Sequence, residues 1–569
     1  MKDFNQKEDG RKKYKVLFII LCLLFSVFQT IGICIYKYNG LNVKYYLHGW
    51  MEVIAVFTLS MLISCVVLYL FFKYMLIFEY SKDNFFHKII MKLMKKPVRN
   101  SFLVISFFWL PWIVAFYPGS LFYDMTHQLA QYYGTYTIQT HPPFSTMIMG
   151  WCMDIGKCIF NSDNIGLFIY VILQYIVCAY ACSKVMSLLK DINIPYYLWG
   201  IILAFYALFP LYGSTVQCAM KDTLNYGLTL LVAVWYIRLF IEINENKLKK
   251  SSIAFYILYC FISCLYRKEM VYVYIVITIV INLFMLYKQR NKKFFVTLVI
   301  MVFSIYLSNI FTNDLISKKY FNQEFVQGEA ESLSIPLQQI ARYVTYYGDE
   351  IKDDEKNIIG ECFSYGYDGI HLNYNPNISD PIKYNFDVKK SKANGFWKVY
   401  MALFKRNPFV YVESILASGY GYFSVVPNVP TTINDAPTNG LPGGRIASTY
   451  MNLDPVKESK DFYVEYKQDT EKFRIGLTNF VYAFQIPYNL LYSFGFYSWI
   501  TLSMLLIAIL KKGKQYIIPY ILSALLVLVC VASPVNDYGR YYMSVIYIFP
   551  LLIGYTKSIM ISQNKEDER

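Results

Sequence analysis

The sequence predicts a mainly α-helical bundle that crosses a membrane about twelve times and carries a mixed domain outside it. Charged residues make up only 16% of the 569 residues, whereas soluble domains have about 25%. Apolar runs long enough to cross roughly 30 Å of hydrocarbon recur along the chain. Basic residues gather in the short loops between these runs, as expected on the cytoplasmic side of a membrane.

The net charge is distributed unevenly along the chain. The whole sequence has 54 basic and 39 acidic residues, a net charge of +15. Between residues 312 and 475 there are 18 basic and 21 acidic residues, so the rest of the chain has 36 basic and 18 acidic residues. The basic surplus lies mostly in short loops beside apolar runs, where the positive-inside rule places it. We therefore attribute it to membrane topology and expect no nucleic-acid partner.

The apolar runs divide the chain into three parts. Residues 1–311 and 476–569 are expected to form the two transmembrane modules, which are embedded in the lipid bilayer. The expected spans are 16–36, 50–72, 101–116, 164–189, 196–213, 224–243, 252–266, 271–287, 294–311, 494–510, 516–532 and 543–560. Alternating them from a cytoplasmic N-terminus predicts a multipass plasma-membrane protein with both termini in the cytoplasm.

The remaining part, residues 312–475, lies outside the membrane in this topology. It has no apolar run of spanning length and contains turn-rich stretches such as VPNVPTTINDAPTNGLPGG. We expect a mixed soluble domain over about 312–408, a membrane-touching segment over 409–426, and then an extended loop. The apolar stretch 144–160 is expected to form an interfacial or re-entrant helix, and the stretch 476–493 is expected to lie at the membrane interface.

The loop 117–143 connects two spans on the outer face and contains no Lys or Arg. Pro118-Gly119 and Pro142-Pro143 mark turns at its two ends, and DMTHQ within it places Asp124 and His127 three residues apart, on one face of a helix. His141 precedes the closing Pro-Pro. One carboxylate and two imidazoles in a loop of this kind make it a candidate catalytic loop. An ordinary polar connector would have a similar composition.

Other charged residues fall on the same face, at the ends of spans. They are Lys221, Asp222, Arg267, Glu269, Asp537 and Arg540. A charged group at membrane depth costs about 2.5 to 3.5 kcal/mol on insertion scales, so charges kept near this boundary are functional candidates. Each has a plainer interpretation: Lys221-Asp222 as a helix-end pair reaching water, Arg267 to Glu269 as a tight turn, and Asp537 with Arg540 as a surface ion pair.

Four stretches carry a resemblance to a known class of enzymes. They are YPGSLFYDMTHQ, THPPFSTMIMGW, FPLYGSTVQCAMKDTLNYG and YRKEM, in this order. The chain resembles the GT-C class of integral membrane glycosyltransferases, which includes the protein O-mannosyltransferases and the aminoarabinose transferases. It more closely resembles an uncharacterised bacterial multipass family of GT-C type, with patterns like PLQQIARYV (336–344) and SDPIKY (379–384). The resemblance covers roughly residues 109–383.

This resemblance implies an enzyme whose donor is a sugar linked to polyprenyl phosphate and bound at the membrane surface. It implies that Asp124 is the catalytic acidic residue of the first outer loop, and that the acceptor is a cell-envelope glycan, a lipid or a protein. Loops of this class often have a second acidic residue beside the first, or Lys or Glu before the double proline. This chain has Met125 and His141 at those positions, so a divalent cation bound by Asp124, His127 and His141 is left open.

The chemistry of such a transfer assigns expected roles. A single-step inverting displacement needs a base beside the acceptor hydroxyl and positive charge beside the departing phosphate. We expect Asp124 to be the base, Arg267 and Arg540 to bind the phosphate through their planar guanidinium groups, and Lys221 to add a point charge. Further candidate substrate-binding residues are His127, His141, Asp222, Glu269, Arg342 and Asp537.

Two other functions remain as alternatives. A lipid-linked glycan transporter or flippase would also have about twelve spans, but it should place charges inside several spans and have repeated halves. This sequence concentrates its unusual charges at one face and shows no internal repeat. A non-enzymatic assembly or receptor protein would need far fewer spans for anchoring.

Overall fold

The computed structural model describes residues 2–77, 85–135, 141–289, 293–321, 329–425, 456–458, 461–485 and 487–567. Most of these residues form helices, as expected. Within them, ten helices are long and apolar enough to cross a membrane. They are α1 (Lys2–Tyr38), α2 (Gly49–Ile77), α4 (Pro97–Ala115), α7 (Asp163–Asp191), α10 (Lys221–Asn244), α12 (Met270–Gln289), α13 (Lys293–Ile310), α23 (Phe494–Lys512), α24 (Ile518–Val531) together with the preceding residues 514–517, and α25 (Gly539–Asp567).

The expected count of twelve spans is reached only if two further elements cross as well. The helices α8 (Tyr196–Leu208) and α9 (Pro210–Val216) meet at a 45° bend, and Pro210 explains the break because proline cannot donate the next helical hydrogen bond. Counting this pair as one span gives eleven. The shorter apolar helix α11 (Lys250–Tyr266) would be the twelfth.

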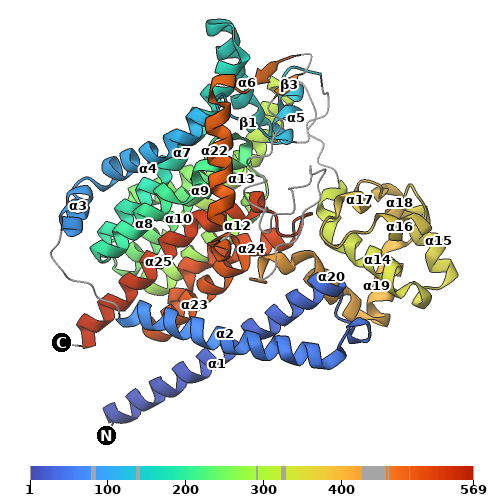
Figure 1. Cartoon of the computed structure of the whole chain (residues 1–569), viewed down its shortest axis with the longest axis horizontal. Helices are drawn as coiled ribbons and strands as arrows, with labels where there is room; N and C mark the ends of the chain where they lie inside the picture. The colour runs from blue at the N-terminus through green and yellow to red at the C-terminus, as the bar shows by residue number, and fades with distance from the viewer. Residues whose placement is uncertain are drawn as a thin grey trace.

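Helix α10 lies at the centre of the bundle, packed against α7, α11, α12 and α25. The buried share of its apolar window is 89%, against 17% for α2, which lies beside α1 at one edge (Figure 1). A helix that is apolar on all sides is typical of a bundle interior, and exposed apolar faces such as those of α1 and α2 are typical of contact with lipid. The charged N-terminus of α10 is therefore buried by its neighbours.

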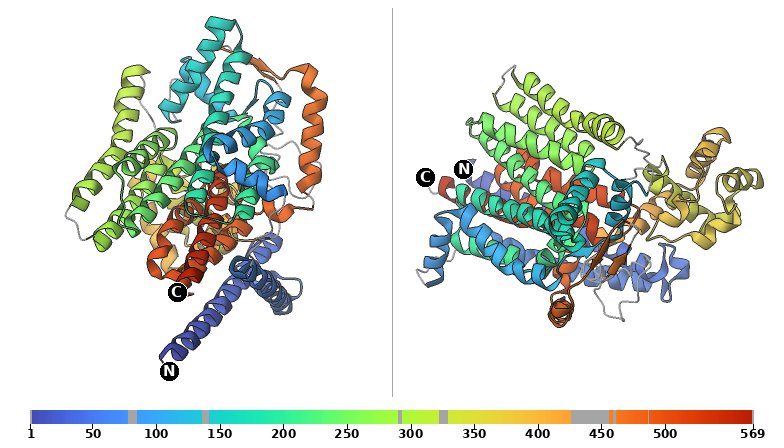
Figure 2. Two further views of the ribbon diagram at one scale, coloured as in Figure 1. Left: turned by 90° about the vertical axis from the view of Figure 1, so that its left-hand side faces the viewer. Right: turned by 90° about the horizontal axis from the view of Figure 1, so that it is seen from above.

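A separate group of helices stands to one side of the bundle (Figures 1 and 2). We call it the helical domain, residues 329–423. It consists of η3 (Glu329–Leu333), α14 (Ser334–Tyr347), η4 (Gly348–Glu350), α15 (Asp353–Glu361), α16 (Asp368–Asn373), α17 (Asp380–Lys383), α18 (Val388–Ala393), α19 (Phe396–Arg406), α20 (Pro408–Gly419) and η5 (Tyr420–Tyr422). Its own apolar core includes Leu337, Ile340, Phe363 and Phe396.

The boundaries and content of this middle part differ from the expectation. The segment Phe311–Tyr320 (η2) continues α13 as a π-helix, and this helical segment runs past residue 311, where the first module is expected to end. The helical domain has helices where a mixture with strands was expected. The strands β3 (Val456–Glu458) and β4 (Tyr463–Glu465) pair antiparallel, and β4 packs on α7 of the bundle. The turn-rich stretch 426–444 lies outside the described residues.

Shorter elements complete the bundle. They are η1 (Val43–Tyr45), α3 (Phe85–Met94), β1 (Ser120–Leu121), α5 (Tyr123–Tyr132), α6 (Pro143–Phe160), β2 (Cys218–Ala219), η6 (Gln468–Thr470), α22 (Glu471–Gln485), η7 (Asn489–Tyr492) and η8 (Lys514–Ile517). The helix expected around Asp124 is thus present as α5. Residues 136–140 of the loop 117–143 lie outside the described residues.

Candidate functional site

A two-stranded parallel pairing brings the starts of α5 and α10 together. In β1 and β2, Ser120 pairs with Cys218 and Leu121 with Ala219. Because the strands are parallel, both chains leave the pairing at the same edge, as in larger parallel sheets. Asp124 follows three residues after the end of β1, and Lys221 follows two residues after the end of β2. The carboxylate of one loop therefore meets the charged start of the central helix.

Gly119, just before β1, allows this approach. Its φ of +125° lies in a region that favours glycine, and a Cβ there would overlap the side chain of Val171 on α7. Its neighbour Ser120 donates its backbone N–H to the carbonyl oxygen of Gln217 at 3.2 Å. The loop before Asp124 thus runs directly against the chain that enters α10.

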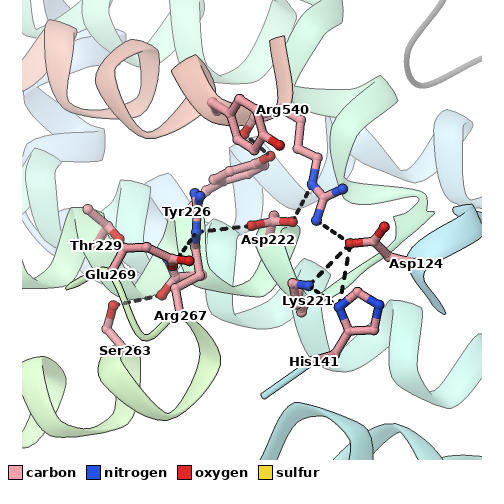
Figure 3. A network of polar contacts seen from close by, with 12 residues as sticks. Asp124, His141, Lys221, Asp222, Tyr226, Thr229, Ser263, Arg267, Glu269 and Arg540 are labelled. Atoms are coloured by element: carbon pink, nitrogen blue, oxygen red, sulfur yellow. Dashed lines mark hydrogen bonds and ion pairs between the residues drawn. The ribbon is translucent and has the colours of Figure 1, made fainter. Parts of the chain in front are cut away.

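Two arginines reach the same place from other helices (Figure 3). Arg267 is the residue after the end of α11, and Arg540 lies in the first turn of α25. Both side chains are about nine-tenths buried: 11% of the Arg267 side chain and 8% of the Arg540 side chain are exposed. Helices distant in sequence therefore deliver their terminal charges to one buried cluster.

Arg540 bridges the two carboxylates of this cluster. Its Nε lies 2.6 Å from Asp222 Oδ2, and its Nη2 donates to Asp124 Oδ2. Asp222 Oδ1 also lies 3.3 Å from Nε of Arg267, at ion-pair distance. Asp222 is the most buried member, with 1% of its side chain exposed. A carboxylate so deep in the protein requires close cationic partners to remain charged.

Lys221 and His141 complete the contacts of Asp124. Nζ of Lys221 lies 3.2 Å from Asp124 Oδ2 and 2.8 Å from Nδ1 of His141. An ammonium group has no acceptor, so Nδ1 of His141 accepts this hydrogen bond and the imidazole proton is on Nε2. His141 Nδ1 is 3.9 Å from Asp124 Oδ2. Lys221 therefore links the imidazole to the carboxylate.

The protonation states of Asp124 and His141 follow from burial and from these charges. Burial favours the neutral form of Asp124, but Arg540, Lys221 and His141 act against it and hold the pKa of its carboxyl well below the usual range. Burial, with the nearby charge of Lys221, lowers the pKa of His141 to about 3. At neutral pH Asp124 is thus ionised and His141 is neutral.

Counting charges gives the main property of the site. Three cations, Lys221, Arg267 and Arg540, face two carboxylates, Asp124 and Asp222, and all five side chains are buried. Glu269 lies 3.7 Å from Arg267, but 57% of its side chain is exposed, so water screens its charge. Among these five described residues, the cations exceed the carboxylates by one, in a poorly hydrated place. Such a site is suited to bind an anionic group.

The geometry does not fit a divalent cation. Among the described residues no group of three or more His, Cys, Asp or Glu side chains is arranged to hold a metal ion. The ammonium group of Lys221 lies between Asp124 and His141, where a bound cation would need to be. His127 is exposed, and its ring centre is 6.5 Å from that of His141. His127 and His141 thus lie near one another beside a site already filled by a cationic side chain.

The structure contradicts two of the plainer interpretations of the charged residues, and it places one candidate binding residue, Arg342, outside the cluster. Lys221 and Asp222 are buried instead of reaching water, and Asp537 and Arg540 are both buried, so they are not a surface pair. Arg342 lies in the helical domain, where its Nε donates to Glu413 Oε2 at 2.8 Å. It is therefore not brought to the cluster around Asp124.

Sequence reasoning missed the aromatic residues that flank the arginines. The guanidinium carbon of Arg540 lies 5.1 Å from the ring centre of Phe122 and 5.9 Å from that of Tyr541. The guanidinium carbon of Arg267 lies 5.7 Å from the same Tyr541 ring. Cation–π contacts of this kind stabilise a buried guanidinium group. The only signal was adjacency in sequence, because Tyr541 follows Arg540 and Phe122 lies two residues before Asp124.

Apolar helices of spanning length around a buried charge cluster define a polytopic helical membrane protein. The chain belongs to DUF6020, a family of unknown function, whose pattern matches residues 122–568. The match begins two residues before Asp124 and includes all five charged residues of the cluster. No curated protein and no solved structure matches the chain.

Proposed function

We propose that this protein is a membrane glycosyltransferase that moves a sugar from a polyprenyl-phosphate-linked donor to an acceptor outside the cytoplasm. The observation that carries the proposal is the buried cluster in which three cations outnumber two carboxylates. A lipid phosphate would neutralise the surplus charge. The carboxylate of Asp124, in the same cluster, would accept the proton of the acceptor hydroxyl.

The transfer is a single displacement at the anomeric carbon. The acceptor oxygen forms a bond to that carbon, while the bond from the carbon to the phosphate oxygen breaks and its electron pair stays on the phosphate. Asp124 accepts the proton of the acceptor hydroxyl. Arg267, Arg540 and Lys221 stabilise the charge that develops on the leaving phosphate. The expected configuration of the product is inverted.

Substrate binding would also activate Asp124. In the resting site its carboxylate is held by Arg540 and Lys221, and its low pKa makes it a poor proton acceptor. A phosphate that shares these two cations weakens their interaction with Asp124, so the pKa of Asp124 rises toward its ordinary range. The base would then be strongest when the donor is in place.

The distribution of charge supports this function over a transporter or flippase. Within the apolar spans that the structure describes, the buried charged residues outside the cluster are Glu242 and Lys557, which lie near the ends of α10 and α25. In a carrier, charges inside several spans would be expected along the substrate path. On the positive-inside rule the cluster faces the outside of a plasma membrane, where an envelope acceptor is available.

The decisive experiment replaces Asp124 by Asn and measures sugar transfer in membranes of a strain that lacks the native gene. Since a general base contributes about 10² to 10⁴ in rate, we expect transfer to fall by at least about 100-fold at unchanged protein abundance. The deletion strain itself, analysed for envelope sugars, identifies the product. Asp154→Asn is the matched control, because Asp154 on α6 accepts a hydrogen bond from Tyr132 away from the cluster. Full activity of Asp124→Asn would disprove the role of Asp124.

A further inference from the structure

The segment before α25 is fixed to the helical domain by one buried asparagine. The backbone N–H of Asn536 donates to the carbonyl oxygen of Asn377 at 2.8 Å, and its side-chain amide donates to Asn377 Oδ1 at 3.0 Å. Its own Oδ1 accepts the backbone N–H of Gly421 at 3.1 Å. Asn536 is fully buried. We call the Asn377–Asn536 contact the amide clasp.

Neighbouring contacts extend the clasp along both chains. Ile378 and Val535 form an antiparallel bridge, and the N–H of Ser379 donates to the carbonyl oxygen of Pro534 at 2.8 Å. From η5, the hydroxyl of Tyr422 donates to the carbonyl oxygen of Val535 at 2.9 Å. The segment 534–536 is thus held between two parts of the helical domain.

The clasp lies immediately before Arg540. Asp537, the next residue after Asn536, has a φ of +55° and turns the chain into α25. On the other side, the hydroxyl of Tyr226 on α10 donates to the carbonyl oxygen of Arg540 at 2.7 Å. The first turn of a helix lacks intrahelical partners for its N–H groups, so contacts from outside set its position. Just before this turn, the N–H of Tyr538 donates to the hydroxyl of Tyr422 in the helical domain at 3.2 Å, and α10 adds the contact of Tyr226 to the carbonyl oxygen of Arg540.

We propose that Asn536 and Asn377 are positioning residues through which the helical domain places the guanidinium group of Arg540 between Asp124 and Asp222. The inference rests on the proposed function in one respect, since it takes Arg540 as a ligand of the donor phosphate. The helical domain then contributes to phosphate binding by positioning Arg540, although its residues 329–423 lie outside the charge cluster.

Asparagine suits this role because it uses both its donor and its acceptor. Asn536→Ala leaves the N–H of Gly421 and the side-chain oxygen of Asn377 without these partners, in a buried place. Asn536→Asp keeps the shape but removes the amide donor and adds a charge. Both variants weaken the contact and leave Arg540 itself unchanged.

The first experiment compares Asn536→Ala with the wild type, as full-length protein in lipid nanodiscs. We expect faster amide hydrogen exchange over 537–543 and at least about tenfold weaker binding of a short-chain polyprenyl phosphate, because a misplaced guanidinium group loses its paired hydrogen bonds. Asn385→Ala is the matched control: Asn385 makes two side-chain hydrogen bonds inside the helical domain. It should leave both readouts unchanged.

The second experiment replaces the clasp by a covalent bond. The bridge between Ile378 and Val535 places residues 377 and 536 opposite one another, and Cα atoms of such pairs are about 4.5 to 5.5 Å apart, within disulfide range. The double variant Asn377→Cys with Asn536→Cys should bind weakly when reduced and regain phosphate affinity when oxidised. Wild type treated with the same oxidant controls for its native cysteines.

The outcomes separate this inference from the proposed function. If wild type binds no polyprenyl phosphate, the proposed function fails, and exchange over 537–543 alone decides the inference. Unchanged exchange in Asn536→Ala would overturn the positioning role. Faster exchange with unchanged phosphate affinity would overturn it too, because the clasp would then stabilise α25 without placing Arg540. Recovery on oxidation supports positioning, since a general folding defect would not be reversed by one local bond.

Discussion

Two buried arginines in this protein have opposite surroundings. Arg342 has an acceptor at each of its three nitrogen atoms: Glu413 accepts from Nε, the hydroxyl of Tyr374 lies 3.1 Å from Nη1, and the carbonyl oxygen of Asn39 accepts from Nη2. The second oxygen of Glu413 accepts the N–H of Leu41 at 2.6 Å. One cation and one carboxylate cancel there, and the pair joins the helical domain to the turn between α1 and α2.

Arg540 belongs to a cluster in which cationic side chains outnumber carboxylates. It shares Asp124 and Asp222 with Lys221 and Arg267, so one positive charge remains. Burial of a charged residue is therefore not in itself a sign of function, since the Arg342 pair is equally buried. A buried surplus of charge is the informative feature, because a protein gains nothing structurally from leaving it unpaired.

The largest effect on stability is expected at the balanced pair. Arg342→Leu leaves Glu413 buried without its cation, which costs about 3 to 5 kcal/mol. The purified variant should unfold at a clearly lower temperature than the wild type. The double variant with Glu413→Leu should recover much of this loss, because no buried charge is left. Equal destabilisation of the single and double variants would contradict a simple ion pair.

The next effect concerns binding at the unbalanced cluster. Arg540→Gln leaves two cations with two carboxylates, so the surplus charge disappears. We expect donor use to fall about 100-fold, or about 2.7 kcal/mol, in transfer assays at rising donor concentration. Arg406→Gln, which breaks an ion pair with Glu355 in the helical domain, serves as a control and should retain normal donor use. Normal donor use by Arg540→Gln would show that the surplus has no role in binding.

A smaller effect is expected in the pH dependence of stability, which tests the protonation state of His141 in the cluster. The pKa of His141 is about 3 in the folded protein, whereas an unfolded histidine has about 6.5. Between these values the unfolded chain binds the additional proton, so stability falls as pH falls below about 6.5. At pH 5 the loss amounts to about 2 kcal/mol. His141→Asn should therefore lose less thermal stability than wild type between pH 7 and pH 5, and an identical loss would contradict a buried neutral imidazole.

The smallest effect tests geometry at constant charge. Arg267→Lys keeps the surplus but replaces a planar, two-pronged donor by a point charge. We expect about a tenfold weaker apparent affinity for the donor, or about 1.4 kcal/mol, with little change in the maximal rate. Titration of transfer activity with donor measures this. An unchanged affinity would mean that Arg267 acts by its charge alone.

The spans and the assembly of the cluster were largely accessible from the sequence. Long apolar runs require helices in a membrane, and charges at their ends can gather only where those ends meet, which is how Asp124 and Arg540 came to be paired as candidates. The two-residue strands β1 and β2 were not accessible, since such short runs have no periodic signal. The partner of Arg342 was equally hidden, because Glu413 lies 71 residues away within an ordinary helical pattern.

The unneutralised charge beside Asp222 has a practical consequence for the resting protein. A buried cluster in which cations outnumber carboxylates attracts small anions from the medium, and under the proposed function such an anion competes with the phosphate of the donor. We therefore expect the proposed transfer activity to depend on the identity of the buffer salt as well as on its ionic strength, with multivalent oxyanions inhibiting it more than chloride does.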